Sequence, residues 1–232
     1  MDWLYEKVGD ADFAEIRNTS LGKLVRNQLL GQILKGEVSP GQALREADLV
    51  EQLKVSRAPV REALRELESM GLVVSRKHSG VYVRELNNRE IHDLYNFRAL
   101  LDEHAGRQAS QLPAQEKAVL IERLQSCVEE MDQAITDSNT QRYYGANLRF
   151  HWLFVESANN GEVNDAYRTV IQKLHLARLK NLSTSDHRVI SNQEHKEIVN
   201  ALNDSKTLKH ANYCGELLHH HVIKAYERLF ED

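Results

Sequence analysis

The chain has 232 residues, of which 41% are hydrophobic and 28% charged, and its net charge at pH 7 is -4. That length and apolar fraction suffice for two modest domains with buried cores, and charged residues interrupt every apolar stretch before the ~18 residues that a membrane-spanning helix needs. Cys127 and Cys214 lie far apart without a CxxC pattern, so the sequence suggests neither a disulfide framework nor a cysteine-based zinc site.

Charge is distributed unevenly along the chain. Residues 1–19 have 2 basic and 5 acidic side chains, residues 20–86 have 11 and 8, and residues 87–232 have 17 and 21. The middle segment is therefore basic within an acidic chain, which permits DNA binding without establishing it. Residues 1–19 lack the basic start and apolar centre of a secretion signal, which predicts a cytoplasmic protein with an N-terminal extension that is expected to be mobile.

Three helices are predicted after this extension. Apolar residues recur at helical spacing over Leu21–Leu34, with Ser20 placed to cap the N-terminus. A Ser-Pro-Gly turn at 39–41 precedes a second, short helix over Leu44–Leu53. Ser56 is then placed to cap a third helix that runs to about residue 70.

The third predicted helix has an apolar face and an arginine face. Arg57, Arg61 and Arg65 recur at steps of four, so their guanidinium groups point the same way. Arginine can bond both guanine and phosphate, which favours a DNA-reading helix. The alternative is that these arginines only pair with the glutamates of the same helix, at positions 62, 66 and 68.

A short β-hairpin is predicted after the third helix. Residues 71–74 start one strand, residues 77–80 form a basic turn, and residues 81–83 return as a second strand. Three helices followed by such a wing form a winged helix-turn-helix over residues 20–86, and this fold binds DNA.

Residues 20–86 resemble the GntR family of bacterial regulators. The resemblance lies in the segments PGQALREADLVEQL, VSRAPVREALRELESMGLVV and HSGVYV. This resemblance implies a homodimer that sets two recognition helices on a palindromic, double-stranded operator. The residues that it implies for DNA contact are Ser56, Arg57, Ala58 and Arg61 on the helix, with Lys77, His78 and Gly80 at the groove edge.

One position departs from the family pattern. Relatives often have a basic DNA-contacting residue where this chain has Ala47. Without that side chain, Arg57 and Arg61 are expected to make a larger share of the contacts with DNA.

The second half of the chain, residues 87–232, is predicted to be an all-α antiparallel helical bundle that binds an effector and dimerises. Turn-forming residues divide it into helices at about 88–110, 114–137, 140–158, 162–182, 187–203 and 207–230. The change from wing to helices places the domain boundary near Leu86. The fold class is therefore mainly α, with a small β-wing in the N-terminal domain.

Ten of the eleven histidines fall in this second half, which raises the possibility of metal binding. Asn147 and His151 share one helical face, and His195 begins another apolar run. His221 lies on an apolar stripe and is expected to point inward, with His220 in reserve. Imidazoles that converge from three helices would suit zinc or nickel, with a weak oxygen ligand from Asn147.

This half also resembles the all-helical FCD effector domain of one GntR branch, through R-A-L-L-D at 98–102, N-x3-H, E-H and L-L-x-x-H. The resemblance implies that His151, His195 and His221 are metal ligands. Many relatives have aspartate in place of Asn147, and an amide is a poorer, uncharged ligand.

A bound cation with Arg98 or Arg149 beside it would suit a small organic acid as effector, because a carboxylate can ligate the ion or pair with guanidinium. The alternative for these arginines is a structural ion pair. The sequence thus predicts a ligand-responsive regulator, most simply a repressor. Two other functions stay open: a metal sensor, and a metal-dependent enzyme, although no HExxH motif or catalytic carboxylate pair supports the enzyme.

Overall fold

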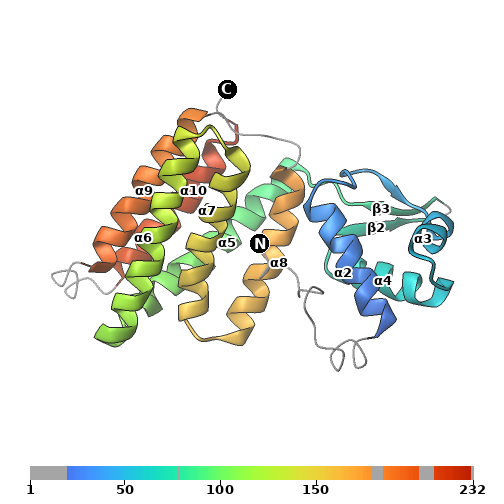
Figure 1. The fold of residues 1–232 in the computed structure, drawn as a ribbon, viewed down its shortest axis with the longest axis horizontal. Coiled ribbons are helices and arrows are strands. Elements are labelled where there is room, and N and C mark those ends of the chain that lie inside the picture. Colours follow the sequence, from blue (N-terminus) through green and yellow to red (C-terminus); the bar gives the residue numbers. More distant parts are fainter. Residues whose placement is uncertain (1–19, 78, 179–184, 204–211, 231–232) are drawn as a thin grey trace. The chain divides into compact units, whose positions relative to one another are not determined.

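The computed structural model describes residues 20–77, 79–178, 185–203 and 212–230, and these fold as two units (Figure 1). The first unit contains residues 20–91 together with 171–178, and the second contains the other described residues. No described helix is both long enough and apolar enough to cross a membrane. The predicted extension, residues 1–19, lies outside the described residues, and the domain boundary near Leu86 stays a prediction.

The first unit combines a helix-turn-helix with a three-stranded antiparallel sheet in the order β1-β3-β2. Its elements are α2 (Leu21–Leu34), β1 (Ala43–Leu44), α3 (Glu46–Leu53), α4 (Arg57–Ser69), β2 (Val73–Arg76) and β3 (Gly80–Val83). The hairpin of β2 and β3 pairs Arg76 with Gly80 at its turn, and this is the predicted wing. The winged helix-turn-helix fold is therefore confirmed.

Local sequence explains the packing of α2 against α4. The Ser20 side chain accepts a hydrogen bond from the Lys23 backbone N–H at 3.2 Å, which caps α2 as predicted. Leu29 and Ile33 on α2 and Leu67 on α4 are each at most 1% exposed. These apolar faces form the core of the unit and leave the opposite face of α4 in solvent.

Two details differ from the predicted boundaries. Leu44 begins the predicted second helix, but in the structure it belongs to β1, opposite Val81, and α3 starts at Glu46. An extended backbone at Leu44 pairs with β3 and still buries the side chain, which a short helix would not achieve. Ser56 occupies the N-cap position of α4, but its side chain makes no capping hydrogen bond.

The second half of the chain is helical in all its described elements. These are α5 (Asn88–Ser110), α6 (Ala114–Thr136), α7 (Thr140–Ser157), α8 (Gly161–Arg178), α9 (Ser185–Asn203) and α10 (Tyr213–Glu227). In Figure 1, α6 lies beside both α7 and α9, and α9 lies beside α10. The predicted helical bundle is confirmed, while residues 179–182 and 207–211 of the predicted helices lie outside the described residues.

A close approach of two glycines joins α5 to α10. A Cβ atom on Gly215 would lie 2.5 Å from the backbone oxygen of Glu103, and one on Gly106 would lie 2.8 Å from the Gly215 Cα. Only glycine permits this separation of the two helices. The contact lies one to two turns from Asp102 on α5 and His221 on α10, so it positions both.

Candidate functional site

The exposed face of α4 presents the residues predicted to read DNA. Ser56, Arg57, Ala58 and Arg61 are all exposed, whereas Val60 is fully buried. The helix begins at Arg57, so its first, unpaired backbone N–H groups lie next to the first arginine. This end of α4 therefore combines a guanidinium group with the positive end of a helix dipole.

The arginines of α4 do not pair with the glutamates of α4. Arg61 Nε donates to Glu46 Oε2 on α3 at 2.8 Å, and Glu66 accepts from Arg26 on α2 at 3.0 Å. Within the described part of the chain, Arg57 has no ion-pair partner. The alternative of an arginine face neutralised by its own helix is therefore not what the structure shows.

The wing contributes a second exposed basic element. Lys77 and Gly80 are exposed at the β2–β3 turn, and Gly80 has a φ of +100° with open space where a Cβ atom would stand. The Arg76 guanidinium stacks 4.3 Å from the centre of the Tyr82 ring. His78 lies outside the described residues, and the exposed Ala47 leaves α3 without a basic side chain at that position.

Three histidines converge inside the second unit, as the sequence predicts. His151 on α7, His195 on α9 and His221 on α10 each place a ring nitrogen within 4.8 Å of the other two. Their exposed fractions are 0%, 0% and 4%. Three helices that are distant in sequence thus build one buried imidazole cluster.

Two carboxylates determine which nitrogens of this cluster are available. His151 Nδ1 lies 2.8 Å from Asp102 Oδ1, and His221 Nδ1 lies 2.7 Å from Glu194 Oε2. Because an ionised carboxylate only accepts, each Nδ1 carries the proton and each Nε2 is left with a lone pair. Among the residues that the structure describes, no hydrogen-bond partner meets the buried His151 Nε2 or either nitrogen of His195.

Burial keeps the cluster uncharged. Desolvation lowers the pKa of His151 to about 4, against the opposing attraction of Asp102. Burial also lowers the pKa of His195 and of His221. The imidazoles are therefore neutral near pH 7, which is the form that binds metal ions.

Asp102 is the centre of a buried charge network. Although burial opposes it, the interactions with His151, which gains its charge only in acid, and with Arg98 hold the pKa of Asp102 below its ordinary value. Arg98 Nε donates to Asp102 Oδ2 at 3.2 Å, and the Tyr167 hydroxyl donates to the same oxygen at 3.3 Å. Arg98, predicted to bind the effector, is thus buried beside the cluster and already paired with a carboxylate.

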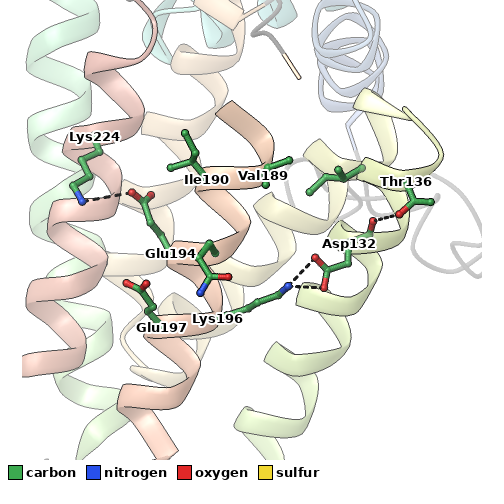
Figure 2. Close-up of a pocket in the computed structure, with 10 residues that line it drawn as sticks. Asp132, Thr136, Val189, Ile190, Glu194, Lys196, Glu197 and Lys224 are labelled. Carbon is green, nitrogen blue, oxygen red and sulfur yellow. Dashed lines mark hydrogen bonds and ion pairs between the residues drawn. The ribbon is translucent and has the colours of Figure 1, made fainter. Parts of the chain in front are cut away.

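Glu194 links the cluster to the surface of the bundle. Burial would raise its pKa, but hydrogen bonds from His221 and Arg228 lower the pKa of Glu194 to about 2. Figure 2 shows Glu194 facing Lys224, and Lys196 paired with Asp132. These side chains line a groove of about 840 Å³ formed by residues of α6, α9 and α10. The carboxylate that orients His221 therefore also forms part of an open groove.

Of the other residues predicted for the metal and effector sites, one lies close to the histidine cluster and two lie away from it. Asn147 is buried, one helical turn before His151 on the same face of α7. Arg149 is half exposed and pairs with Glu130 at 3.0 Å, so its prediction as an effector contact is not supported by its position. His220 is exposed and bonds the Glu216 carbonyl, because the apolar stripe of α10 turns His221 inward instead.

Sequence reasoning gave no role to Asp102, Tyr167 or Glu194. Asp102 lies four residues after Arg98, a spacing that places both on one helical face and could have indicated the pair. Glu194 directly precedes His195 in sequence but bonds His221, and Tyr167 comes from a different helix altogether. Only the packing of the bundle could reveal these last two contacts.

The donor set fits a divalent metal ion. Three neutral imidazoles converge here, and those of His151 and His195 have buried nitrogens without a partner among the described residues. Carboxylates orient His151 and His221, which matches the ligands and the second-layer hydrogen bonds of zinc sites. A buried polar atom without a partner is costly, and coordination to a cation would satisfy it.

Comparison with known proteins agrees with these two parts. The family model for bacterial regulatory proteins of the gntR family matches residues 21–83, and the model for the FCD domain matches residues 93–220. A crystal structure of a putative transcriptional regulator GntR from Rhodococcus sp. RHA1 superposes with a TM-score of 0.73 at 23% identity, covering 91% of this chain and 98% of that one. The likeness of fold thus extends over most of both chains.

Two curated proteins are similar over most of their length. The Nta operon transcriptional regulator of Aminobacter aminovorans is 30% identical over 83% of this chain and 86% of its own. The probable D-xylose utilization operon transcriptional repressor of Paenarthrobacter nicotinovorans is 29% identical over 92% and 90%. Proteins of this kind are DNA-binding transcription regulators rather than enzymes. The chain belongs to the gntR family of bacterial regulatory proteins, in the branch whose second half is an FCD domain.

Proposed function

We propose that this regulator is a homodimeric repressor that binds a palindromic operator in the cytoplasm and is released by a small organic acid. One relative is named a probable repressor, which supports the direction of control. The observation that carries the DNA-binding part is Arg57 at the exposed start of α4, which has no ion-pair partner in the described part of the chain. A C2 dimer would present α4 twice, as a palindrome requires.

The proposed DNA contacts follow from exposure and charge. Arg57 is free to bond a base or a phosphate, and Ser56 and Ala58 flank it on the same helix end. Arg61 would have to break its ion pair with Glu46 to contact DNA, and the cost of breaking that pair partly offsets the favourable energy of the new contact. Lys77, His78 and Gly80 of the wing are proposed at the groove edge, where the open space around Gly80 permits close approach.

Loss of two arginines tests this arrangement. Each specific arginine–base contact contributes ~1–3 kcal/mol, so Arg57→Ala with Arg61→Ala should weaken binding about 30-fold or more. The probe is a duplex that the wild-type protein selects from a randomised pool, and binding is measured by fluorescence anisotropy. Arg149→Ala, which removes an exposed arginine of the second unit, is the control. Equal affinity of the double variant and this control would overturn the proposed readout.

In the helical half we propose a divalent metal ion, zinc or nickel, held by His151, His195 and His221. Asn147 would be a weak fourth ligand, since an amide oxygen adds no charge. A bound cation would attract the carboxylate of an effector and polarise it. Asp102 and Glu194 would orient His151 and His221 through their Nδ1 atoms, and Arg98 would add positive charge to the effector site.

Metal titration tests the cluster directly. Metal-depleted protein should take up one zinc or nickel ion per chain, as measured by elemental analysis and by a rise in melting temperature. His195→Ala should lose this ion, because both of its ring nitrogens are unpaired. His220→Ala should keep it, because His220 is exposed and bonds its own helix. Equal uptake by the two variants would exclude the cluster as the site.

The same material separates two kinds of signal. If metal-saturated protein keeps its operator and releases it only with an added small organic acid, the acid is the effector. If metal alone releases the operator, the protein is a metal sensor, and the proposal of an organic effector fails.

A further inference from the structure

We infer that Arg45 is a further DNA-contacting residue, which binds a backbone phosphate from the start of α3. This inference rests on the proposed DNA binding. Arg45 would supply, two residues earlier in the chain, positive charge that Ala47 does not provide.

The backbone places Arg45 between the two exposed DNA-binding elements. β1 pairs with β3 so that Leu44 lies opposite Val81, and the antiparallel register continues toward Gly80 at the wing turn. Arg45 directly follows β1 and is the N-cap residue of α3, with extended backbone angles of φ -80° and ψ 122°. It therefore stands where the wing and the helix-turn-helix join.

Arg45 also lies next to the arginine face of α4. The adjacent residue, Glu46, accepts the 2.8 Å hydrogen bond from Arg61. That bond brings the side chain of Arg61 to the first turn of α3, which directly follows Arg45 in the chain. One edge of the first unit thus combines Arg61, Arg45 and the wing turn.

The charge of Arg45 is available. The side chain is exposed, makes no capping bond, and has no carboxylate partner among the residues that the structure describes. Two other arginines of this unit are already paired: Arg26 with Glu66, and Arg84 with Glu90. An exposed, unpaired guanidinium can bond a phosphate through two N–H groups without first breaking an ion pair.

The acidic residues in the first turn of α3 allow a substitution that should strengthen DNA binding to be set against one that should weaken it. Glu46 is paired with Arg61, but Asp48 is exposed in the first turn of α3 and is not paired with Arg45. Its charge opposes a phosphate at this position. Asp48→Asn should therefore strengthen binding, whereas Arg45→Ala should weaken it.

The experiment measures affinity against salt concentration. Binding of full-length protein to the selected duplex and to a scrambled duplex is followed by anisotropy between about 50 and 200 mM salt. Loss of one phosphate contact lowers the slope of log K against log salt by about 1. Arg45→Ala should show this change and about 5- to 10-fold weaker binding on both duplexes. Arg45→Lys should restore the slope.

Lys35→Ala is the matched control, because it removes the same charge from an exposed position at the end of α2. If Arg45→Ala binds within twofold of this control, or changes base preference without changing the slope, the phosphate contact is wrong while operator binding stands. If the wild-type protein selects no duplex at all, the proposed function fails as well.

Discussion

The two units of this protein use arginine in different ways: one exposes it to solvent, and the other buries it in an ion pair. On the first unit Arg57 is exposed and has no partner among the described residues. In the bundle Arg98 is 5% exposed and is bonded to Asp102, which in turn accepts from Tyr167. An exposed guanidinium keeps its hydration until a polyanion arrives, whereas a buried one requires a permanent counter-charge.

The two sites differ because they meet different partners. The DNA-binding surface needs available charge on a rigid helix, and its apolar face against α2 provides the rigidity. The histidine cluster needs neutral ligands in a dry site, so the charges lie on the carboxylates that bond Nδ1 of His151 and His221 and on the arginines that pair with those carboxylates. Each unit places its charges where solvent, or a partner side chain, can stabilise them.

The largest expected effect is on stability, and it distinguishes a buried arginine–carboxylate pair from a half-exposed one. Asp102→Asn removes the counter-charge of Arg98 and should lower the free energy of unfolding by about 3–5 kcal/mol, measured by urea denaturation. Glu130→Gln removes the carboxylate that pairs with the half-exposed Arg149 and should change it by less than about 1 kcal/mol. Similar losses for both variants would break the distinction between the two kinds of pair.

A smaller effect tests the contact that holds the buried charges together. Gly215→Ala would place a Cβ atom 2.5 Å from the Glu103 backbone oxygen, and such overpacking should destabilise the bundle by about 1–3 kcal/mol. Gly145→Ala on α7 meets no atom within 4 Å and should be neutral or stabilising by up to about 1 kcal/mol, since alanine favours helices. Thermal unfolding of the two variants measures the difference. A stable Gly215→Ala protein would show that α5 and α10 are free to separate.

The smallest effect is a dependence on pH in metal-free protein. In the unfolded chain His151 takes up its proton near pH 6.5, whereas in the folded chain burial lowers its pKa to about 4. The unfolded state therefore binds more protons between these values, and the free energy of unfolding falls as the pH falls through this window. For His151 alone the loss from pH 7.5 to 5.5 is about 1 kcal/mol.

Two variants test whether His151 contributes to this loss of stability at low pH. His151→Gln should reduce the dependence, and the part that remains comes from His195 and His221, whose pKa values burial also lowers. His220→Gln, which changes an exposed histidine outside the cluster, is the control. Stability that stays constant over this window in the wild-type protein would show that the cluster is hydrated rather than dry.

Much of the fold was predictable because its signals are local. The Ser20 cap, the apolar face of α4 and the turns between the bundle helices depend on residues within a few positions of one another. The error at Leu44 arose because its partner, Val81, is 37 positions away in the printed sequence, and a two-residue strand has no periodicity of its own.

Sequence alone determined the order of turn, arginine-bearing helix and wing, because helical spacing decides which side chains share a face. That His151, His195 and His221 act together was implied by the resemblance to the FCD domain rather than by spacing. The tertiary structure alone decided their partners. It paired Arg61 with Glu46, His151 with Asp102 and His221 with Glu194, and it removed Arg149 and His220 from the cluster. Such pairings join separate elements, and they depend on how helices pack rather than on the period of any one helix.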